Sequence, residues 1–186
     1  MSVLTMYVTM SSVIFGGIAN MIFCKTPFYK KHNAPIDFGR TYKNKRIFGE
    51  NKTWIGFLGM IVFCMIGQLL SGFLCKSLSL ENQFYEHHSN IIGWNLALGA
   101  CLGFLYMFFE LPNSFIKRRL DIKPGKTTNL FFFVFDQIDS LIGVMLVLFF
   151  TSDINLWIYL CYVGLGGLTH IVINLILYKL RVRKNL

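Results

Sequence analysis

Five apolar stretches alternate with polar segments along this chain. They cover residues 3–23, 54–75, 91–109, 131–150 and 154–178. Each is about twenty residues long, which as a helix is enough to cross the hydrocarbon core of a bilayer. The pattern therefore predicts an all-α integral membrane protein with about five transmembrane helices, in a single membrane-embedded domain over residues 1–186. The composition agrees, since 54% of the residues are hydrophobic and the mean hydropathy is +0.54.

The basic residues predict the orientation of these helices. Eight Lys and Arg residues fall within 25–52, five within 117–126 and four after position 178, so that only Lys76 lies in another loop. Five spans place the three basic groups on one side of the membrane, and the positive-inside rule makes that side cytoplasmic. We therefore expect the N-terminus outside, the C-terminus in the cytoplasm, and the protein in the cell (inner) membrane.

The net charge of +9 is concentrated on this one face of the expected membrane protein. Such a face suits anionic lipid headgroups and nucleotide phosphates. Nucleic acid is not an expected partner, because the charge is dispersed among spans that leave no room for a groove-reading module. Whether the chain forms a homo-oligomer is left open.

The first cytoplasmic loop, at about 24–53, combines glycines with basic residues. Gly39 and Gly49 allow tight backbone turns, and the loop ends in Lys52 and Thr53 directly before an apolar stretch. A glycine loop that runs into a helix start can present backbone N–H groups, an ammonium and a hydroxyl to phosphate. The alternative is a solvated loop that is attracted to anionic lipid, and the spacing alone does not separate the two.

The second cytoplasmic loop, at about 110–130, precedes two carboxylates inside an apolar run. Asp136 and Asp139 are three residues apart, so a helix places them on one face, near enough to share a cation. Ser114, Lys117 and Arg118 share a face by the same spacing argument. Carboxylates in a transmembrane helix are costly and usually functional. Metal-binding carboxylates beside phosphate-binding cations favour a nucleotide site, and the alternative is a structural pair neutralised by basic neighbours.

Residues 35–57, PIDFGRTYKNKRIFGENKTWIGF, resemble the first cytoplasmic motif of the CDP-archaeol synthase family. That motif typically runs PxDxGxxxxGKRxxGxxKTxRG. The matching positions here are Pro35, Asp37, Gly39, Lys45, Arg46, Gly49, Lys52, Thr53 and Gly56. Two positions depart from it, since Asn44 stands where the family usually has Gly and Ile55 where it commonly has Arg.

A second resemblance is to the wider phosphatidate cytidylyltransferase signature, SxxKRxxxxK followed by DxxD. The matching positions are Ser114, Lys117, Arg118, Lys123, Asp136 and Asp139. We call residues 35–57 the first motif and residues 114–139 the second motif.

The resemblance implies an enzyme that transfers CMP from CTP to a membrane lipid phosphate of the phosphatidic or archaetidic acid type. The products would be a CDP-lipid and pyrophosphate. It implies that Asp136 and Asp139 hold one or two Mg²⁺ ions, and that Ser114 donates to a phosphate or reaches the metal. It also implies that four cations contact phosphate. Those cations are Lys117, Arg118, Arg46 and Lys52. The resemblance also implies that substrate is bound by Asp37, Gly39, Gly49, Thr53 and Lys123.

Two other functions remain open at this point. A CTP-dependent polyprenol kinase would transfer the γ-phosphorus instead of the α-phosphorus. A small ion-coupled transporter would use the intramembrane aspartates, although the chain lacks the duplicated halves often seen in transporters.

The remaining polar residues of the apolar stretches have structural explanations. Asn20, His170 and Asn174 are expected mainly to satisfy hydrogen bonds within the helix bundle. The alternatives are a ligand contact for Asn20 and a substrate contact for His170. The adjacent His87 and His88 are expected to be incidental. The basic tail is expected to anchor headgroups through Lys179, Arg181, Arg183 and Lys184.

Overall fold

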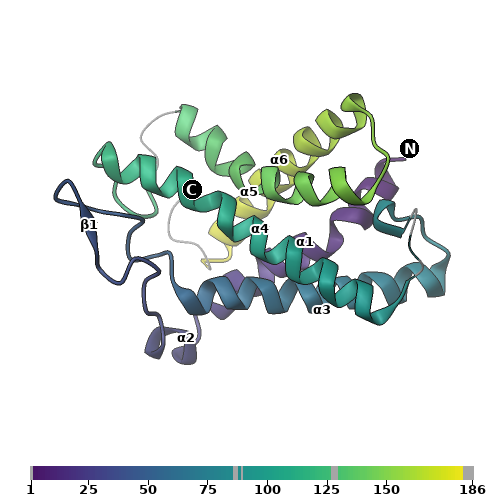
Figure 1. Cartoon of the computed structure of the whole chain (residues 1–186), viewed down its shortest axis with the longest axis horizontal. Coiled ribbons are helices and arrows are strands. Elements are labelled where there is room, and N and C mark those ends of the chain that lie inside the picture. Colours follow the sequence, from purple (N-terminus) through teal and green to yellow (C-terminus); the bar gives the residue numbers. More distant parts are fainter. Residues whose placement is uncertain (1, 86–87, 89, 127–129, 182–186) are drawn as a thin grey trace.

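Five long helices make up most of the structure, a computed structural model that describes residues 2–85, 88, 90–126 and 130–181 (Figure 1). They are α1 (Val3–Phe23), α3 (Trp54–Leu78), α4 (Ile92–Arg119), α5 (Leu130–Thr151) and α6 (Leu156–Lys179). All 5 are long and apolar enough to cross a membrane. The prediction of an all-α membrane protein with five spans is confirmed. The small exception is a two-stranded hairpin in the first loop.

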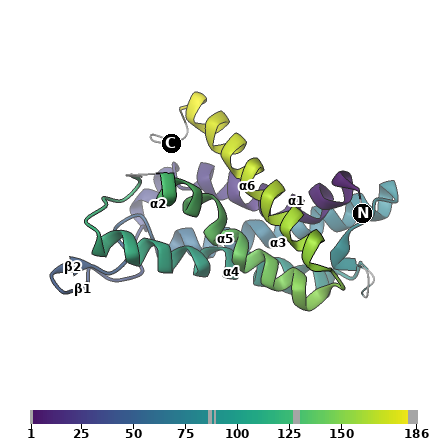
Figure 2. The same ribbon diagram turned by 90° about the horizontal axis from the view of Figure 1, so that it is seen from above.

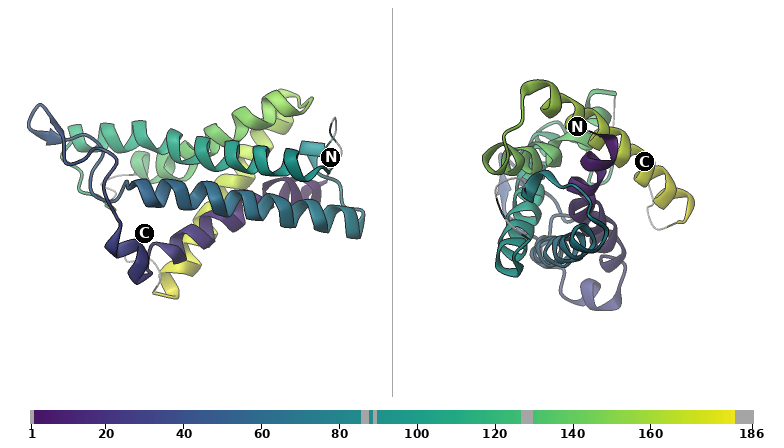
Figure 3. Two further views of the ribbon diagram at one scale, coloured as in Figure 1. Left: turned by 60° about the horizontal axis from the view of Figure 1, so that its bottom comes forward. Right: turned by 90° about the vertical axis from the view of Figure 1, so that its right-hand side faces the viewer.

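The two ends of the bundle differ in character. One end carries α2 (Pro27–Lys31) and the antiparallel hairpin of β1 (Thr41–Tyr42) and β2 (Lys45–Arg46). The N-terminus and the short helix η1 (Gln83–Tyr85) lie at the other end, and α6 runs back toward the hairpin end (Figures 1 and 3). Both motifs therefore meet at the hairpin end. That this end faces the cytoplasm stays a prediction.

α4 is longer than the sequence pattern indicated. The stretch predicted as a loop at 110–130 begins as helix, because α4 continues through Pro112 to Arg119. Proline lacks the N–H for one helical hydrogen bond and often ends a helix. Here the residues beyond it are held by tertiary contacts, including a pair between Lys117 and Asp136. The true turn begins only at Leu120.

Close backbone contacts fix α4 between α3 and α5. A Cβ atom at Gly99 would lie 2.6 Å from Met65 Cα, and one at Gly103 would lie 2.6 Å from Ile61 Cα, so both glycines press on the backbone of α3. On the other side, Gly143 of α5 presses on the carbonyl of Leu105. Small residues at these positions are what lets transmembrane helices approach so closely. No larger side chain fits without moving a helix.

α6 packs against α5 and, less extensively, against α1. Figure 2 shows that it crosses the bundle obliquely and that its C-terminal part leans away from the other helices. The buried core lies among α1, α3, α4, α5 and the first part of α6. It includes Met6, Met10, Met60, Cys64, Leu98, Leu102, Met145, Leu148 and Tyr162.

Candidate active site

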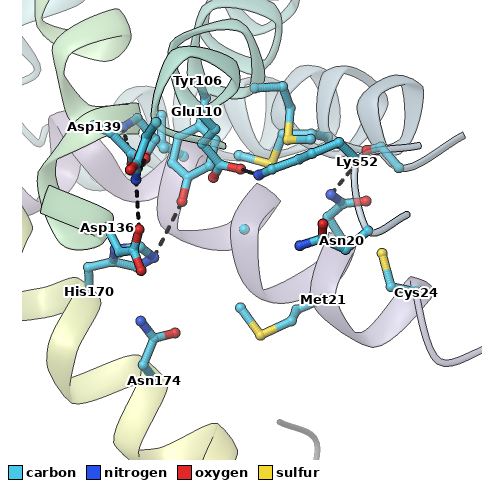
Figure 4. Close-up of a pocket in the computed structure, with 18 of the residues that line it drawn as sticks. Asn20, Met21, Cys24, Lys52, Tyr106, Glu110, Asp136, Asp139, His170 and Asn174 are labelled. Atoms are coloured by element: carbon cyan, nitrogen blue, oxygen red, sulfur yellow. Dashed lines mark hydrogen bonds and ion pairs between the residues drawn. The ribbon is translucent and has the colours of Figure 1, made fainter. Parts of the chain in front are cut away.

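A cavity of about 480 Å³ opens among α1, α4, α5, α6 and the end of the first loop (Figure 4). Its polar part is formed by carboxylates and cations of the two motifs. Figure 4 shows Glu110, Asp136 and Asp139 gathered on one side together with His170 of α6, with Asn20 of α1 across from them. Residues far apart in the sequence thus surround one space.

One face of α4 supplies much of the polar wall. Five of its residues line the cavity, and each is one or three positions from the next: Glu110, Asn113, Ser114, Lys117 and Arg118. Helical geometry brings residues three and four apart onto a common face. The face shared by Ser114, Lys117 and Arg118 is therefore present, and it extends one turn further back to Glu110.

The two aspartates of α5 face this wall. Lys117 Nζ donates to both oxygens of Asp136, at 2.6 Å to Oδ1 and 2.5 Å to Oδ2. The Nδ2 amide nitrogen of Asn113 donates to Asp136 Oδ1 at 2.6 Å and to Asp139 Oδ2 at 2.7 Å. Asp139 is buried and Asp136 is half-buried. One nitrogen atom thus reaches both carboxylates, which places their oxygens around a common point.

This arrangement fits a divalent cation that binds together with a phosphate. Magnesium is usually held by one or two carboxylates, with substrate oxygens and water completing its shell. Asp136 and Asp139 offer the two carboxylates, and the carbonyl oxygen of Asn113 is buried beside them without a partner among the described residues. The described part of the chain contains no cluster of three or more His, Cys, Asp or Glu residues that would bind a metal by itself.

Lys52 and Glu110 join the first loop to α4. The Nζ of Lys52 forms an ion pair with Oε2 of Glu110, and both side chains are largely buried. Burial alone would lower the pKa of Lys52, but the charge and hydrogen bond of Glu110 outweigh burial and raise it. The Lys52 side chain is therefore a fixed ammonium at the cavity wall.

Arg118 is a buried cation of a different kind. It is 9% exposed, lines the cavity, and donates from Nη1 to the backbone carbonyl of Ile122. Among the described residues, its Nε has no hydrogen-bond partner and no carboxylate lies within ion-pair distance of the guanidinium. A buried charge without a counter-ion is costly. The guanidinium is therefore suited to an anion that enters the cavity.

Asp37 organises the first motif. It accepts hydrogen bonds from Arg46 at 2.6 Å and 3.3 Å, and from the backbone N–H groups of Gly39, Phe48 and Gly49 at 3.0–3.1 Å. Burial would raise the pKa of this carboxyl, but the hydrogen bonds, with Arg46 first, lower it to about 2. Gly39 and Gly49 have φ angles of 79° and 105°, which side chains rarely adopt. The shape of this loop thus depends on one buried carboxylate.

The residues predicted for the site therefore fall into two sets. The cavity is lined by Asp136, Asp139, Lys117, Ser114, Arg118, Lys52 and Thr53. Away from its lining lie Asp37, Gly39, Arg46, Gly49 and Lys123. Four of the second set shape the loop that carries Lys52, whereas Lys123 is exposed beyond the end of α4.

Thr53 connects the loop to α3. Its hydroxyl oxygen caps the helix by accepting from the N–H of Gly56 at 3.1 Å, and it lies 2.8 Å from the hydroxyl of Tyr29. An N-cap threonine satisfies an otherwise unpaired backbone donor. Thr53 therefore fixes where Lys52 leaves the loop.

Glu110 and Asn113 are site residues that the sequence interpretation missed. A carboxylate next to an apolar stretch carries the same signal as Asp136 and Asp139. Glu110 would have been recognised by that signal if the span had been extended past Phe109.

The other polar residues of the helices also line the cavity. Asn20 Nδ2 donates to the carbonyl of Gly56 at 3.1 Å, and Asn174 Nδ2 donates to Gln137 Oε1 at 3.0 Å. His170 lies 3.4 Å from the hydroxyl of Tyr106. These contacts join helices, as expected, and they also place polar atoms at the cavity surface.

The remaining predictions lie far from the cavity or outside the described residues. The ring of His88 lies against that of Trp94 in the first turn of α4, with centroids 3.9 Å apart and the ring planes tilted by 34°. Its neighbour His87 lies outside the described residues, as do Arg183 and Lys184 of the basic tail.

Comparison with known proteins agrees with this geometry. Residues 3–185 match the CarS-like family described as CDP-archaeol synthase. A CDP-archaeol synthase of Pyrobaculum islandicum is 34% identical over 156 residues, which cover 83% of this chain and 82% of the relative. One of Archaeoglobus fulgidus is 30% identical over 191 residues, which cover 90% and 96%.

The fold also has a solved counterpart. It is an intramembrane enzyme for archaeal membrane lipid biosynthesis, 18% identical in sequence, with a TM-score of 0.67 over 94% of this chain and 95% of the other. The family match spans almost the whole chain, and the two motifs meet at one cavity. This chain belongs to the CDP-archaeol synthase family.

Proposed function

We propose that this protein transfers CMP from CTP to the phosphate of a membrane lipid of the archaetidic or phosphatidic acid type, and releases pyrophosphate. The proposal is supported by the family membership and by a cavity that combines carboxylates with cations. One observation carries it furthest. Arg118 is a buried guanidinium without a carboxylate partner among the described residues, and it lines the same cavity as two carboxylates that suit a cation.

The reaction needs little covalent chemistry from the protein. A non-bridging oxygen of the lipid phosphate forms a bond to the α-phosphorus of CTP, and the bond from that phosphorus to the oxygen shared with the β-phosphate breaks. Pyrophosphate leaves with the electron pair of the broken bond. The protein has to hold two anions in line and stabilise the charge that develops between them.

The cations are assigned to the triphosphate and to pyrophosphate. Arg118 supplies a guanidinium that can bind phosphate through two hydrogen bonds, and Lys117 and Lys52 supply ammonium groups. Lys117 is paired with Asp136, and Lys52 is paired with Glu110. Each of these ammonium groups can therefore exchange a carboxylate for a phosphate without crossing the cavity.

The carboxylates are assigned to metal binding. Asp136 and Asp139 would hold one or two Mg²⁺ ions, which when bound neutralise phosphate charge and polarise the α-phosphorus. The Asp139 carboxylate is held in place by the amide of Asn113 and by the backbone N–H of Ser140 at 2.7 Å. Ser114 provides a hydroxyl at the cavity wall that can donate to a phosphate oxygen.

Two phases must supply the substrates. CTP is water-soluble, whereas the chains of the lipid stay in the bilayer. The cavity has polar groups at the hairpin end and apolar lining from α1 and α6, among them Met10, Ile14 and Ile173. We assign the polar part to CTP, entering from the cytoplasm, and the apolar part to the lipid, entering between helices.

Tracing labelled phosphorus tests the reaction. The purified protein is incubated with Mg²⁺, phosphatidic or archaetidic acid, and CTP labelled at either the α- or the γ-phosphorus. We expect the α-label in the lipid product and the γ-label in pyrophosphate. Transfer of the γ-label to a lipid would instead identify a kinase, and transfer of neither label to any lipid or pyrophosphate would contradict the proposal.

Two variants control this assay. Asp136→Asn keeps the shape of the side chain but replaces a carboxylate by a poor magnesium ligand, so most turnover should be lost. Asp121→Asn changes a carboxylate that is 76% exposed and pairs with Lys45, away from the cavity. It should retain activity close to that of the parent.

A further inference from the structure

The side chain of Asn113 occupies the point between the two aspartates. Its Nδ2 lies 2.6 Å from Asp136 Oδ1 and 2.7 Å from Asp139 Oδ2, so its two N–H bonds serve two carboxylates. The residue is 3% exposed and lines the cavity. A donor that bridges two carboxylates takes the place that a shared cation would take.

The other half of the same amide is unsatisfied. Asn113 Oδ1 is buried and has no hydrogen-bond partner among the described residues. A buried polar atom without a partner is rare in native structures and calls for an explanation. The two hydrogen bonds explain why the amide nitrogen points at the aspartates, because two carboxylates repel a carbonyl oxygen and attract N–H groups. They do not explain why the oxygen is buried without a partner among the described residues.

A cation between the aspartates would reverse the preferred orientation of the Asn113 amide. The N–H groups of the amide would then be repelled by the ion, whereas the carbonyl oxygen would be attracted to it. Carbonyl oxygens of Asn are ordinary ligands of hard divalent cations. Rotation of the amide about its Cβ–Cγ bond exchanges the two atoms without moving α4.

We infer that Asn113 is a third protein ligand of the divalent cation held by Asp136 and Asp139, and that its amide nitrogen holds the two carboxylates together while the cation is absent. This inference rests on the proposed function, because it takes the aspartates as metal ligands. It adds a neutral ligand from α4 to the two charged ligands from α5. The cation thereby ties these two helices together.

Metal binding can be measured without turnover. The probe is Mn²⁺, whose free concentration is followed by electron paramagnetic resonance during titration of the purified protein with CTP present. Asn113→Leu keeps a side chain of similar size but removes both polar atoms. Asn95→Leu is the matched control, since Asn95 is also a buried asparagine of α4 that hydrogen-bonds other side chains, near the opposite end.

We expect Asn113→Leu to bind Mn²⁺ at least fivefold more weakly than the parent, and Asn95→Leu to bind it as the parent does. A smaller loss in Asn113→Leu, or an equal loss in the two variants, would overturn the inference. If the parent binds Mn²⁺, Asp136→Asn does not, and Asn113→Leu does, the metal site of the proposed function stands and only the role of Asn113 fails. If the parent binds none, both fail.

A second variant tests whether residue 113 binds the cation directly or only holds the aspartates in place. It also replaces Asn113→Leu if that variant does not fold. Asn113→Cys is made in a background without the five native cysteines, with Asn95→Cys as its control. Thiolates prefer softer metals, so a direct ligand should shift selectivity toward Cd²⁺. In Asn113→Cys we expect the ratio of Cd²⁺ affinity to Mn²⁺ affinity to rise at least tenfold, and a cadmium–thiolate absorption band to appear. An unchanged ratio without that band would show that residue 113 does not touch the cation.

Discussion

Lys52 and Glu110 form a buried ion pair that connects the last residues of the first loop with the middle of α4. The two residues belong to segments that are 58 positions apart in the sequence. Their side chains are 14% and 19% exposed, so little water reaches the pair. The contact therefore sets the position of the first motif relative to the carboxylates of the second.

Breaking this pair on one side should destabilise the protein. Glu110→Gln or Lys52→Met leaves a buried charge without a partner, and such changes typically cost about 3–5 kcal/mol. The double variant Lys52→Met with Glu110→Leu leaves no buried charge and should recover part of the loss. Thermal unfolding in detergent measures all three. Equal stability of the parent and both single variants would show that water compensates for the pair.

Cations at the cavity should matter more for CTP than a cation at the tail. Arg118→Ala and Lys117→Ala each remove a proposed phosphate contact, and a hydrogen bond to a charged group contributes about 1.5–3 kcal/mol. We expect each variant to lose at least about tenfold in kcat/KM for CTP. Arg181→Ala removes an exposed cation just beyond α6 and should stay within a few-fold. Similar, salt-sensitive losses in all three variants would instead indicate general attraction of anions.

Asp37 should make the stability of the first motif depend on pH. Its pKa falls from the ordinary 3.8 to about 2 in the folded protein, which corresponds to about 2 kcal/mol of stabilisation. Because the folded pKa is the lower one, this stabilisation is complete above about pH 4 and is lost as the pH falls toward 2. Asp37→Asn should therefore lower the melting temperature at pH 7, and the difference from the parent should shrink below pH 4.

An exposed carboxylate provides the comparison for that experiment. Asp121 pairs with Lys45 but is 76% exposed, so the Asp121→Asn variant should differ little from the parent at any pH. A constant difference between Asp37→Asn and the parent from pH 7 to pH 3 would show that the charge of Asp37 is not what stabilises the loop.

Cysteine labelling should reveal which end of the bundle faces the cytoplasm. Asn44 lies at the exposed tip of the hairpin, and Ser77 is exposed near the end of α3 at the other end of the bundle. In a background without native cysteines, Ser77→Cys should react with an impermeant reagent in intact cells. Asn44→Cys should react only after permeabilisation. The reverse pattern would place both motifs outside the cell.

The sequence was sufficient for the helices and for part of the site. The apolar stretch at 3–23 predicted α1 to the residue, because a transmembrane helix ends where the chain becomes polar. The same rule failed for α4, where Glu110 and Pro112 marked an end that the structure does not have. Contacts with α5 and the first loop hold those turns, and such contacts cannot be deduced from local sequence.

The roles within the first motif were also beyond the sequence. Matching the motif placed Asp37 and Lys52 together as substrate-binding residues. In the structure Asp37 faces the backbone of its own loop, whereas Lys52 reaches the cavity. A motif records which residues a shape requires, but it does not separate those that build the shape from those that face the ligand.

The glycine contacts of α4 bear on the kind of membrane in which the protein can work. Gly99 and Gly103 press on α3, and Gly143 presses on α4 from α5, so these three helices cannot slide past one another without collision. Bilayers differ in thickness, and helices usually adjust by tilting. α1 is held against α3 in the same way, by Gly16. α6, whose glycines meet only side chains of its neighbours, would absorb the adjustment. The spacing between the carboxylates and the cations would then stay the same in thick and thin bilayers alike.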